Sequence, residues 1–232
     1  RELSVYSEVC PWDEIPVLDD VEGFILSGGP ESSNIEGNPT IDSLIFNTNK
    51  PILGICYGMQ VLAHQEAGQI INEGKKEFGY AKINIKADTV LFKNISDSSD
   101  VWMSHGDKVE SLPDGYAITA TSDNSPIAAY ENISKKYFGL QFHPEVTHTE
   151  NGTGIIKNFL DICGIEQNWS SDDILQQIDA VVAAEVKDQE VLLALSGGVD
   201  STVLAAVLHR TLGNRLTCVM VDHGLLRKDE AQ

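Results

Sequence analysis

The 232-residue chain is long enough for one large domain or two smaller ones, and either can bury a core without disulfides or a bound metal. It is 42% hydrophobic and 22% charged, a composition that excludes disordered and fibrous proteins. Its 35 acidic and 16 basic residues give a formal net charge of -19, which repels phosphate backbones and anionic lipid surfaces. We therefore expect neither nucleic acid nor a membrane as a partner.

The cysteine pattern favours a reducing compartment. Cys10, Cys56, Cys163 and Cys218 are far apart and show no C-x-x-C spacing, so a zinc site has little support. No stretch reaches the roughly 18 apolar residues of a membrane span, and the acidic, polar start lacks the basic and apolar regions of a signal peptide. These features predict a cytoplasmic protein.

Short apolar segments alternate with turns and helix-like stretches, a pattern that predicts an α/β fold with a mainly parallel sheet. Alternating polar and apolar residues at Tyr80–Ile85, and in parts of Ala117–Ala129, predict a more antiparallel patch in the middle of the chain. The expected strands of the α/β pattern are Gly23–Ser27, Pro51–Ile55, Phe138–Phe142, Val191–Leu195 and Leu216–Val221.

A domain boundary is expected near residue 168. The helix-like stretch Gly154–Asp161 closes the first half, and a second helical pattern begins at Ile174 and runs to Val186. Between them, Cys163–Asp173 mixes glycine, polar residues and Trp169. We therefore divide the chain into residues 1–168 and residues 169–232. Only one strand–helix–strand unit fits the second part, and it cannot cover both faces of its sheet, so we expect that domain to be incomplete.

The first chemical motif is a cysteine at a predicted strand-to-helix turn. Cys56 directly follows the strand Pro51–Ile55, and Gly54 and Gly58 flank it in a G-x-C-x-G nucleophile elbow. The turn is so tight that the residues two before and two after the nucleophile must be small. The helix N-terminus favours a thiolate, so Cys56 is the candidate nucleophile. The alternative is a buried free cysteine that acts as a small hydrophobic residue.

A thiolate nucleophile needs a base, and the base needs a partner that fixes its tautomer. His143 and Glu145 provide both, because they would project from the same side at the end of the strand Phe138–Phe142. The alternatives are a structural histidine and a solvated loop carboxylate. His105 lies in a polar turn, Ser104–Asp107, and we expect it next to the substrate and not as the base.

An oxyanion hole requires two backbone amides that point at the tetrahedral oxygen. The amide of Tyr57, directly after the nucleophile, is the first candidate donor. The second is Gly29, in the turn Ser27-Gly28-Gly29-Pro30, where the lack of side chains lets the backbone approach a ligand closely. An ordinary loop glycine is the alternative for Gly29.

Three motifs together resemble class I, triad-type glutamine amidotransferases: the Ser27–Pro30 turn, the segment Gly54–Gln60 and Gln141-Phe142-His143-Pro144-Glu145, in the family's order. The resemblance implies a flavodoxin-like α/β domain in which Cys56 attacks the amide of glutamine. His143 and Glu145 would complete the triad, ammonia would leave, and water would release glutamate from a thioester. The resemblance also implies that glutamine is held by Gly28, Gln60, Ser104, His105, Gly106 and Asp107.

The second motif is a phosphate loop without a Walker lysine. The strand Val191–Leu195 leads through Ser196-Gly197-Gly198-Val199-Asp200-Ser201 into a helical pattern that begins at Thr202, which makes an anion cradle. Asp200 would suit a magnesium ion that screens the phosphates. The alternative is a helix-capping turn with Asp200 or Ser201 as the cap. The full run resembles the pyrophosphate loop of ATP-pyrophosphatases, which implies that Ser196–Thr202 bind ATP.

With the segment Val221–Arg227 added, the resemblance narrows to the family of glutamine-hydrolysing GMP synthases. It implies that ammonia passes to xanthosine monophosphate activated by ATP, giving GMP, AMP and pyrophosphate, and that Val221 helps to form the nucleotide pocket. That family dimerises through its C-terminal part. Compared with its pattern, the chain lacks a strand and helix before Arg1 and stops soon after Arg227, so we expect a fragment.

Two other functions remain open at this point. One is another class I amidotransferase, serving anthranilate, carbamoyl phosphate or CTP synthesis, although none of these is expected to continue into S-G-G-V-D-S. The other is a catalytically silent binding fragment, which ammonia release from glutamine would exclude.

Overall fold

The computed structural model describes residues 2–14, 17–33, 35, 37–72, 76–86 and 89–221. The chain divides into two compact units, residues 1–167 and residues 168–232, and both combine helices with a β-sheet. None of the described helices has the length and apolarity needed to cross a bilayer.

The main feature of the first unit is a seven-stranded mixed sheet in the order β1-β2-β9-β8-β7-β4-β5. Strands β1, β2 and β9 are parallel, and the pairs from β9 to β5 are antiparallel. A separate antiparallel pair joins β3 to β6. The elements are β1 Phe24–Leu26, α1 Ser43–Asn47, β2 Ile52–Ile55, α2 Tyr57–Gln65, β3 Gln69–Ile71, β4 Glu77–Ile85, β5 Ser98–His105, β6 Lys108–Ser111, β7 Ala117–Ser122, β8 Ala129–Asn132, β9 Tyr137–Leu140 and α3 Gly152–Cys163.

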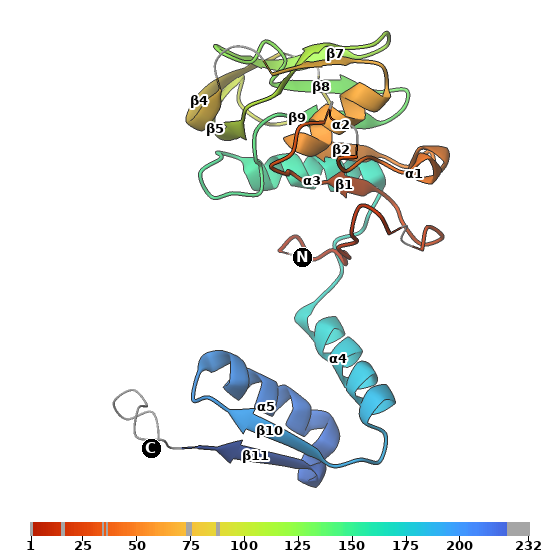
Figure 1. Ribbon diagram of the computed structural model, residues 1–232, viewed down its shortest axis with the longest axis vertical. Helices are drawn as coiled ribbons and strands as arrows, with labels where there is room; N and C mark the ends of the chain where they lie inside the picture. Colours follow the sequence, from red (N-terminus) through yellow and green to blue (C-terminus); the bar gives the residue numbers. More distant parts are fainter. Residues whose placement is uncertain are drawn as a thin grey trace. The chain divides into compact units, whose positions relative to one another are not determined.

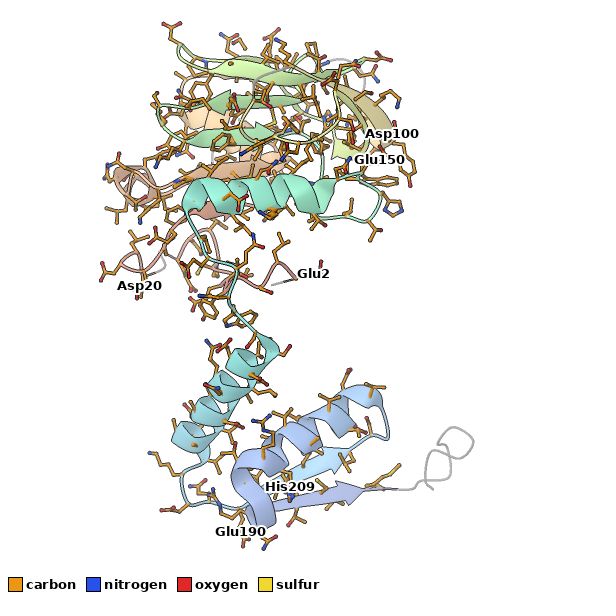
Figure 2. The ribbon with its side chains drawn as sticks, turned by 180° about the vertical axis from the view of Figure 1, so that it is seen from behind. Glu2, Asp20, Asp100, Glu150, Glu190 and His209 are labelled. Carbon is orange, nitrogen blue, oxygen red and sulfur yellow. The ribbon has the colours of Figure 1, made fainter. Side chains whose placement is uncertain are left out.

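Two helices cover opposite faces of this sheet. Helix α2 lies in front of the sheet in Figure 1, and α3 lies in front of it in the reverse view of Figure 2. Side chains of β2 alternate between the two faces, so Ile52 packs in the cluster that contains α2 residues, and Leu53 packs with Ile155 and Phe159 of α3. Complete burial of one such side chain contributes about 1.5–3 kcal/mol, so both helices are held mainly by apolar packing.

The α/β fold and the antiparallel middle of the chain are confirmed. The expected strand Phe138–Phe142 is shifted, because β9 covers Tyr137–Leu140. The amide of Gln141 still donates to the carbonyl of Ala128, next to β8, at 2.9 Å, but the amide of His143 donates to the carbonyl of Trp102 in β5 at 3.0 Å. Helix α1 and the β3–β6 pair were not expected, since each is too short to show a periodic pattern.

The second unit contains the helices α4 Ser171–Val186 and α5 Val199–Leu212, and the strands β10 Val191–Leu195 and β11 Leu216–Met220. A 3-10 turn, η1 Gly213–Arg215, joins α5 to β11, and the two strands pair in parallel. A capping box between Ser170 and Asp173 starts α4. The Val221–Arg227 motif lies outside the described residues from Asp222 onward.

Candidate functional site

Cys56 lies at a sharp turn between β2 and α2. Its backbone has φ 53° and ψ -108°, a conformation that costs a residue with a side chain of this kind about 1–3 kcal/mol. A Cβ atom at Gly54 would lie 2.5 Å from the amide nitrogen of Met59, and one at Gly58 would lie 2.2 Å from the carbonyl oxygen of Leu26. The two glycines therefore let the strand and helix approach closely enough to hold the cysteine in this conformation.

The cysteine sulfur is enclosed by polar backbone and side-chain groups. Cys56 is 4% exposed, and its Sγ lies 3.5 Å from the carbonyl oxygen of Ser104. The side-chain Nε2 of Gln141 lies 3.9 Å from the same sulfur. Because Cys56 directly precedes α2, the sulfur is also next to the unpaired amides of the first helical turn.

His143 is hydrogen-bonded to Glu145 on one side and free on the other. Its Nδ1 lies 2.7 Å from Oε1 of Glu145, whereas its Nε2 is buried and has no hydrogen-bond partner among the described residues. The neighbouring Cys56, together with Glu145, raises the pKa of His143 to about 10. Burial acts to raise the pKa of Glu145, but the hydrogen bond with His143 outweighs it and leaves that pKa below its ordinary value.

The structure brings His143 next to Cys56 across Gly28. A Cβ atom at Gly28 would lie 3.0 Å from Cε1 of His143 and 3.6 Å from Cβ of Cys56, so Gly28 lies close to both side chains. The free nitrogen of His143 is thus available on the side where the thiol lies.

A turn, and not strand alternation, brings His143 and Glu145 together. Both lie after the end of β9, in a segment that is fixed to β5. The hydroxyl of Thr149 donates to the carbonyl of His143 at 2.6 Å, and it accepts from the amide of Trp102 at 3.0 Å. At the end of this segment Glu150 lies beside Asp100 in Figure 2, and the amide of Glu150 donates to the carbonyl of Asp100 at 2.9 Å.

Cys56 and His143 open into a pocket of 510 Å³, within the roughly 300–1,000 Å³ typical of small-molecule sites. Eight of the residues expected from the sequence line it: Gly29, Cys56, Gln60, Ser104, His105, Gly106, Asp107 and His143. Glu145 and Gly28 contact His143 from outside that lining. Lys76 and Glu31, which the sequence did not single out, add one basic and one acidic side chain to the wall.

The two residues expected to supply the oxyanion amides, Tyr57 and Gly29, are in contact. Tyr57 is the first residue of α2, where helix geometry leaves its amide without a partner inside the helix. Gly29 packs against its ring, since a Cβ atom at Gly29 would lie 3.5 Å from Cγ of Tyr57.

A buried cluster around Glu77 supports the floor of the pocket. Oε2 of Glu77 lies 3.1 Å from Nε2 of His105 and accepts from the hydroxyl of Ser125 at 2.6 Å. Oε1 accepts from Ser122 and Asn124, each at 3.3 Å. Nδ1 of His105 in turn lies 3.0 Å from the carbonyl oxygen of Asp107. Burial lowers the pKa of His105, although Asp107 and Glu77 act against it.

Sequence reasoning missed Glu77. It is the first residue of β4, and all its partners come from segments 28 to 48 residues away. No local pattern distinguishes it from an exposed strand carboxylate.

The carboxylate of Asp107, like that of Glu77, is held by several side chains. It accepts hydrogen bonds from the side chains of Ser32 and Asn72, while its backbone carbonyl accepts from Nε2 of Gln60 at 2.8 Å. The turn Ser104–Asp107 is therefore fixed from several sides, which makes it a rigid wall of the pocket.

In the second unit the glycine turn leads directly into α5. Gly197 has φ 80°, and Gly198 is the N-cap of α5 with no side-chain cap. The hydroxyls of Ser201 and Thr202 donate backward to the carbonyl of Gly198 at 3.1 Å and 2.9 Å. Neither Asp200 nor Ser201 is the helix cap, so the amides of the first turn remain available to an anion.

The turn and Val221 lie at the same edge of the two-stranded sheet. Leu195 pairs with Met220 at the carboxyl ends of parallel strands, and Ser196 and Val221 follow them. This is the edge at which α/β sheets bind ligands. Among the described residues no group of three or more His, Cys, Asp or Glu side chains is arranged to hold a metal ion.

Comparison with known proteins agrees with this geometry. Residues 1–163 match the family model of class-I glutamine amidotransferases, and residues 171–232 match that of the PP-loop domain. The chain is 46% identical, over its whole length, to a protein of Vibrio vulnificus named GMP synthase [glutamine-hydrolyzing]. It spans about half of that relative, 46% of its length.

Two solved structures have similar folds. A protein from Thermoplasma acidophilum, proposed to be one of the subunits of a GMP synthase, is 29% identical, with a TM-score of 0.54 over 69% of this chain and 78% of that one. A glutamine amidotransferase from Thermotoga maritima, 21% identical with a TM-score of 0.51, covers 86% of this chain and 80% of its own, and supports the fold alone. By its family match and its cysteine elbow, the chain belongs to the class-I glutamine amidotransferases.

Proposed function

We propose that the chain hydrolyses glutamine to glutamate and ammonia at a triad of Cys56, His143 and Glu145. The observation that carries this proposal is the buried Nε2 of His143, which has no partner among the described residues and lies beside Cys56, while Nδ1 is held by Glu145. A base arranged in this way can take a proton from the thiol and later return it to a leaving group.

The reaction has two steps. Nε2 of His143 holds the proton of Cys56 before the attack, so Sγ attacks the amide carbon of glutamine as a thiolate, and the amides of Tyr57 and Gly29 stabilise the oxyanion. His143 then donates its proton to the departing nitrogen, ammonia leaves and a thioester remains. Water, deprotonated by His143, attacks the thioester, and glutamate is released as the proton returns to the sulfur.

The pocket has the charges that a free amino acid requires. Lys76 and Glu31 lie on its wall, so a carboxylate and an ammonium group can each meet an opposite charge. Gly28, Gln60 and the turn Ser104–Asp107 would enclose the side chain. Residues 1–168 would form this glutaminase domain.

We propose that residues 169–232 begin an ATP-pyrophosphatase domain, in which Ser196–Thr202 and Val221 bind ATP. One carboxylate beside a phosphate site fits a magnesium ion, which keeps most of its ligands as water and phosphate, so Asp200 would hold it. The ion would neutralise phosphate charge. In the protein to which this chain belongs, ammonia would aminate ATP-activated xanthosine monophosphate to GMP, in a cytoplasmic homodimer. The relatives named GMP synthase support this reading.

The direct test is covalent labelling of the purified chain with a diazo-ketone analogue of glutamine, followed by peptide mass spectrometry. We expect label on Cys56 alone, blocked by free glutamine and absent from Cys56→Ser. The variant Cys10→Ser, which removes an exposed cysteine, serves as the control and should label normally. Label that is absent, or spread over all four cysteines, would contradict the proposal and favour a catalytically silent fragment.

A further inference from the structure

Gln141 is a buried side chain beside the nucleophile to which the mechanism above gives no role. It is 0% exposed, it follows β9, and its Nε2 lies 3.9 Å from Sγ of Cys56, within reach of a hydrogen bond to the large sulfur atom. Since Cys56 is itself 4% exposed, little water reaches the sulfur. Any group that stabilises a thiolate here must come from the protein.

The direction of the Gln141 amide is fixed by a chain of hydrogen bonds that starts at a backbone carbonyl. The carbonyl oxygen of Asp107 can only accept, so the side-chain NH2 of Gln60 must face it, at 2.8 Å. The same NH2 group lies 3.2 Å from Oε1 of Gln141. A reversed Gln141 would place two NH2 groups against each other, and a reversed Gln60 would place two oxygens together.

This series of hydrogen bonds leaves the NH2 group of Gln141 facing the sulfur. The first acceptor of this hydrogen-bond series, the carbonyl of Asp107, is held rigidly. Ser32 and Asn72 bind the carboxylate of Asp107, and His105 contacts its carbonyl oxygen. The carbonyl of Ser104, which lies 3.5 Å from the same sulfur, accepts from a thiol and repels a thiolate. Gln141 opposes that preference, since an N–H donor stabilises the charged form.

We propose that Gln141 is a further catalytic residue, whose side-chain amide donates a hydrogen bond to the Cys56 sulfur and stabilises the attacking thiolate. Its importance for glutamine hydrolysis rests on the proposed function. Its effect on the sulfur does not, because any reaction of the thiolate reports it.

The test compares the rate at which iodoacetamide alkylates Cys56 in the purified chain and in Gln141→Glu, followed by mass spectrometry of the Cys56 peptide. Glutamate has the same shape and keeps the oxygen that accepts from Gln60, but it places an oxygen where the NH2 group faced the sulfur. We expect alkylation at neutral pH to slow about tenfold or more, the effect of losing a charge-assisted hydrogen bond. The difference should shrink in alkaline buffer, where the thiolate forms without help.

Two further variants separate the possible causes. Gln141→Met has a similar length, no donor and no charge, so slower alkylation in this variant shows loss of the hydrogen bond and not added charge. Gln65→Glu is the matched control: it is the same change on α2, where Gln65 bonds the backbone of Ile41 at 2.7 Å and 2.8 Å and not the sulfur. Its Cys56 should be alkylated at the unchanged rate.

The proposal fails if both Gln141 variants unfold at the normal temperature and are alkylated at the normal rate. It also fails if they are slowed equally at neutral and alkaline pH, which would indicate altered access to the sulfur. Labelling with the diazo-ketone distinguishes this failure from that of the proposed function. If the variants are alkylated slowly but the unchanged chain never reacts with the glutamine analogue, the proposed glutaminase activity is rejected and the role of Gln141 still holds.

Discussion

At the residue scale, the conformation of Cys56 depends on Gly54 and Gly58, where a side chain would collide with neighbouring backbone. The amide of Cys56 donates to the carbonyl of Leu140 at 2.7 Å, which fixes the cysteine against β9 in its unusual conformation. This hydrogen bond and the close packing of β1, β2 and α2 together stabilise the strained backbone of Cys56.

The most restrictive of these contacts is at Gly58. In Gly58→Ala the new methyl group would collide with the backbone of Leu26, which cannot move without displacing β1. We expect a loss of about 1–3 kcal/mol in the free energy of unfolding, measured by urea denaturation. Gly154→Ala in α3 is the control, because the methyl would meet only the flexible end of Ile95 at 3.2 Å, and alanine favours a helix. Equal stability of the two variants would contradict this account of the elbow.

The titration of His143 follows from its two partners. Its pKa of about 10 lies above the ordinary value near 6.5, so its contribution to stability is complete below about pH 6.5 and is lost as the pH rises through about 10. In Cys56→Ala the largest cause of the shift is removed, and we expect the pKa to fall towards 6.5. In Glu145→Gln it should fall less. NMR titration of the imidazole measures both, and an unchanged pKa in Cys56→Ala would refute the assignment.

At the element scale, the turn between β5 and β6 is held by a carboxylate from the start of β4. Glu77 contacts His105, whose other ring nitrogen contacts Asp107, so the cluster connects β4 with the wall of the pocket. Because buried donors that lose their acceptor are costly, removal of this carboxylate should loosen the turn before it unfolds the sheet.

We expect Glu77→Ala to raise the KM for glutamine about tenfold, with a smaller effect on kcat, since a buried network of this kind is worth about 1–3 kcal/mol. The pKa of His105, already lowered by burial, should fall further without the nearby negative charge. Ammonia release at varied glutamine concentration measures the first effect. Glu110→Ala on β6 is the control, because that carboxylate is exposed. An unchanged KM in a folded Glu77→Ala variant would show that the turn does not need the cluster.

The sequence was sufficient for those parts of the site whose chemistry is local. The elbow glycines lie two residues from Cys56, and Glu145 lies two residues from His143, so a short motif contains the contact. The role of Glu77 and the amide direction of Gln141 could not be predicted from the sequence, because each depends on segments that only the folded sheet brings together. The end of β9 was misplaced for a related reason: Gln141 and Phe142 continue the buried pattern of the strand, while the backbone leaves it and bonds to β5 at His143.

At the scale of the whole molecule, the two chemical motifs are in different units. Cys56, His143 and the pocket residues belong to residues 1–167, and the glycine turn before α5 belongs to residues 168–232. Each unit has its own sheet, and among the residues that the structure describes only the first unit has an extensive set of buried apolar side chains, which includes Phe138, Phe142 and Phe159. In the second unit, Leu192 is 72% exposed and Leu212 is the buried residue of α5.

This distribution of buried surface predicts that the first unit folds and keeps its site without the second. A chain that ends at residue 167 should still react with the diazo-ketone at Cys56, and glutamine should compete. We expect a rate within about twofold of that of the whole chain, because changes at sites that share no contacts act independently. Asp200→Ala in the whole chain should leave this labelling unchanged and weaken only the binding of ATP, measured by calorimetry. If the shortened chain folds, as judged by its circular dichroism, but Cys56 no longer reacts, the second unit must help to form the glutamine site, and the two motifs are not independent.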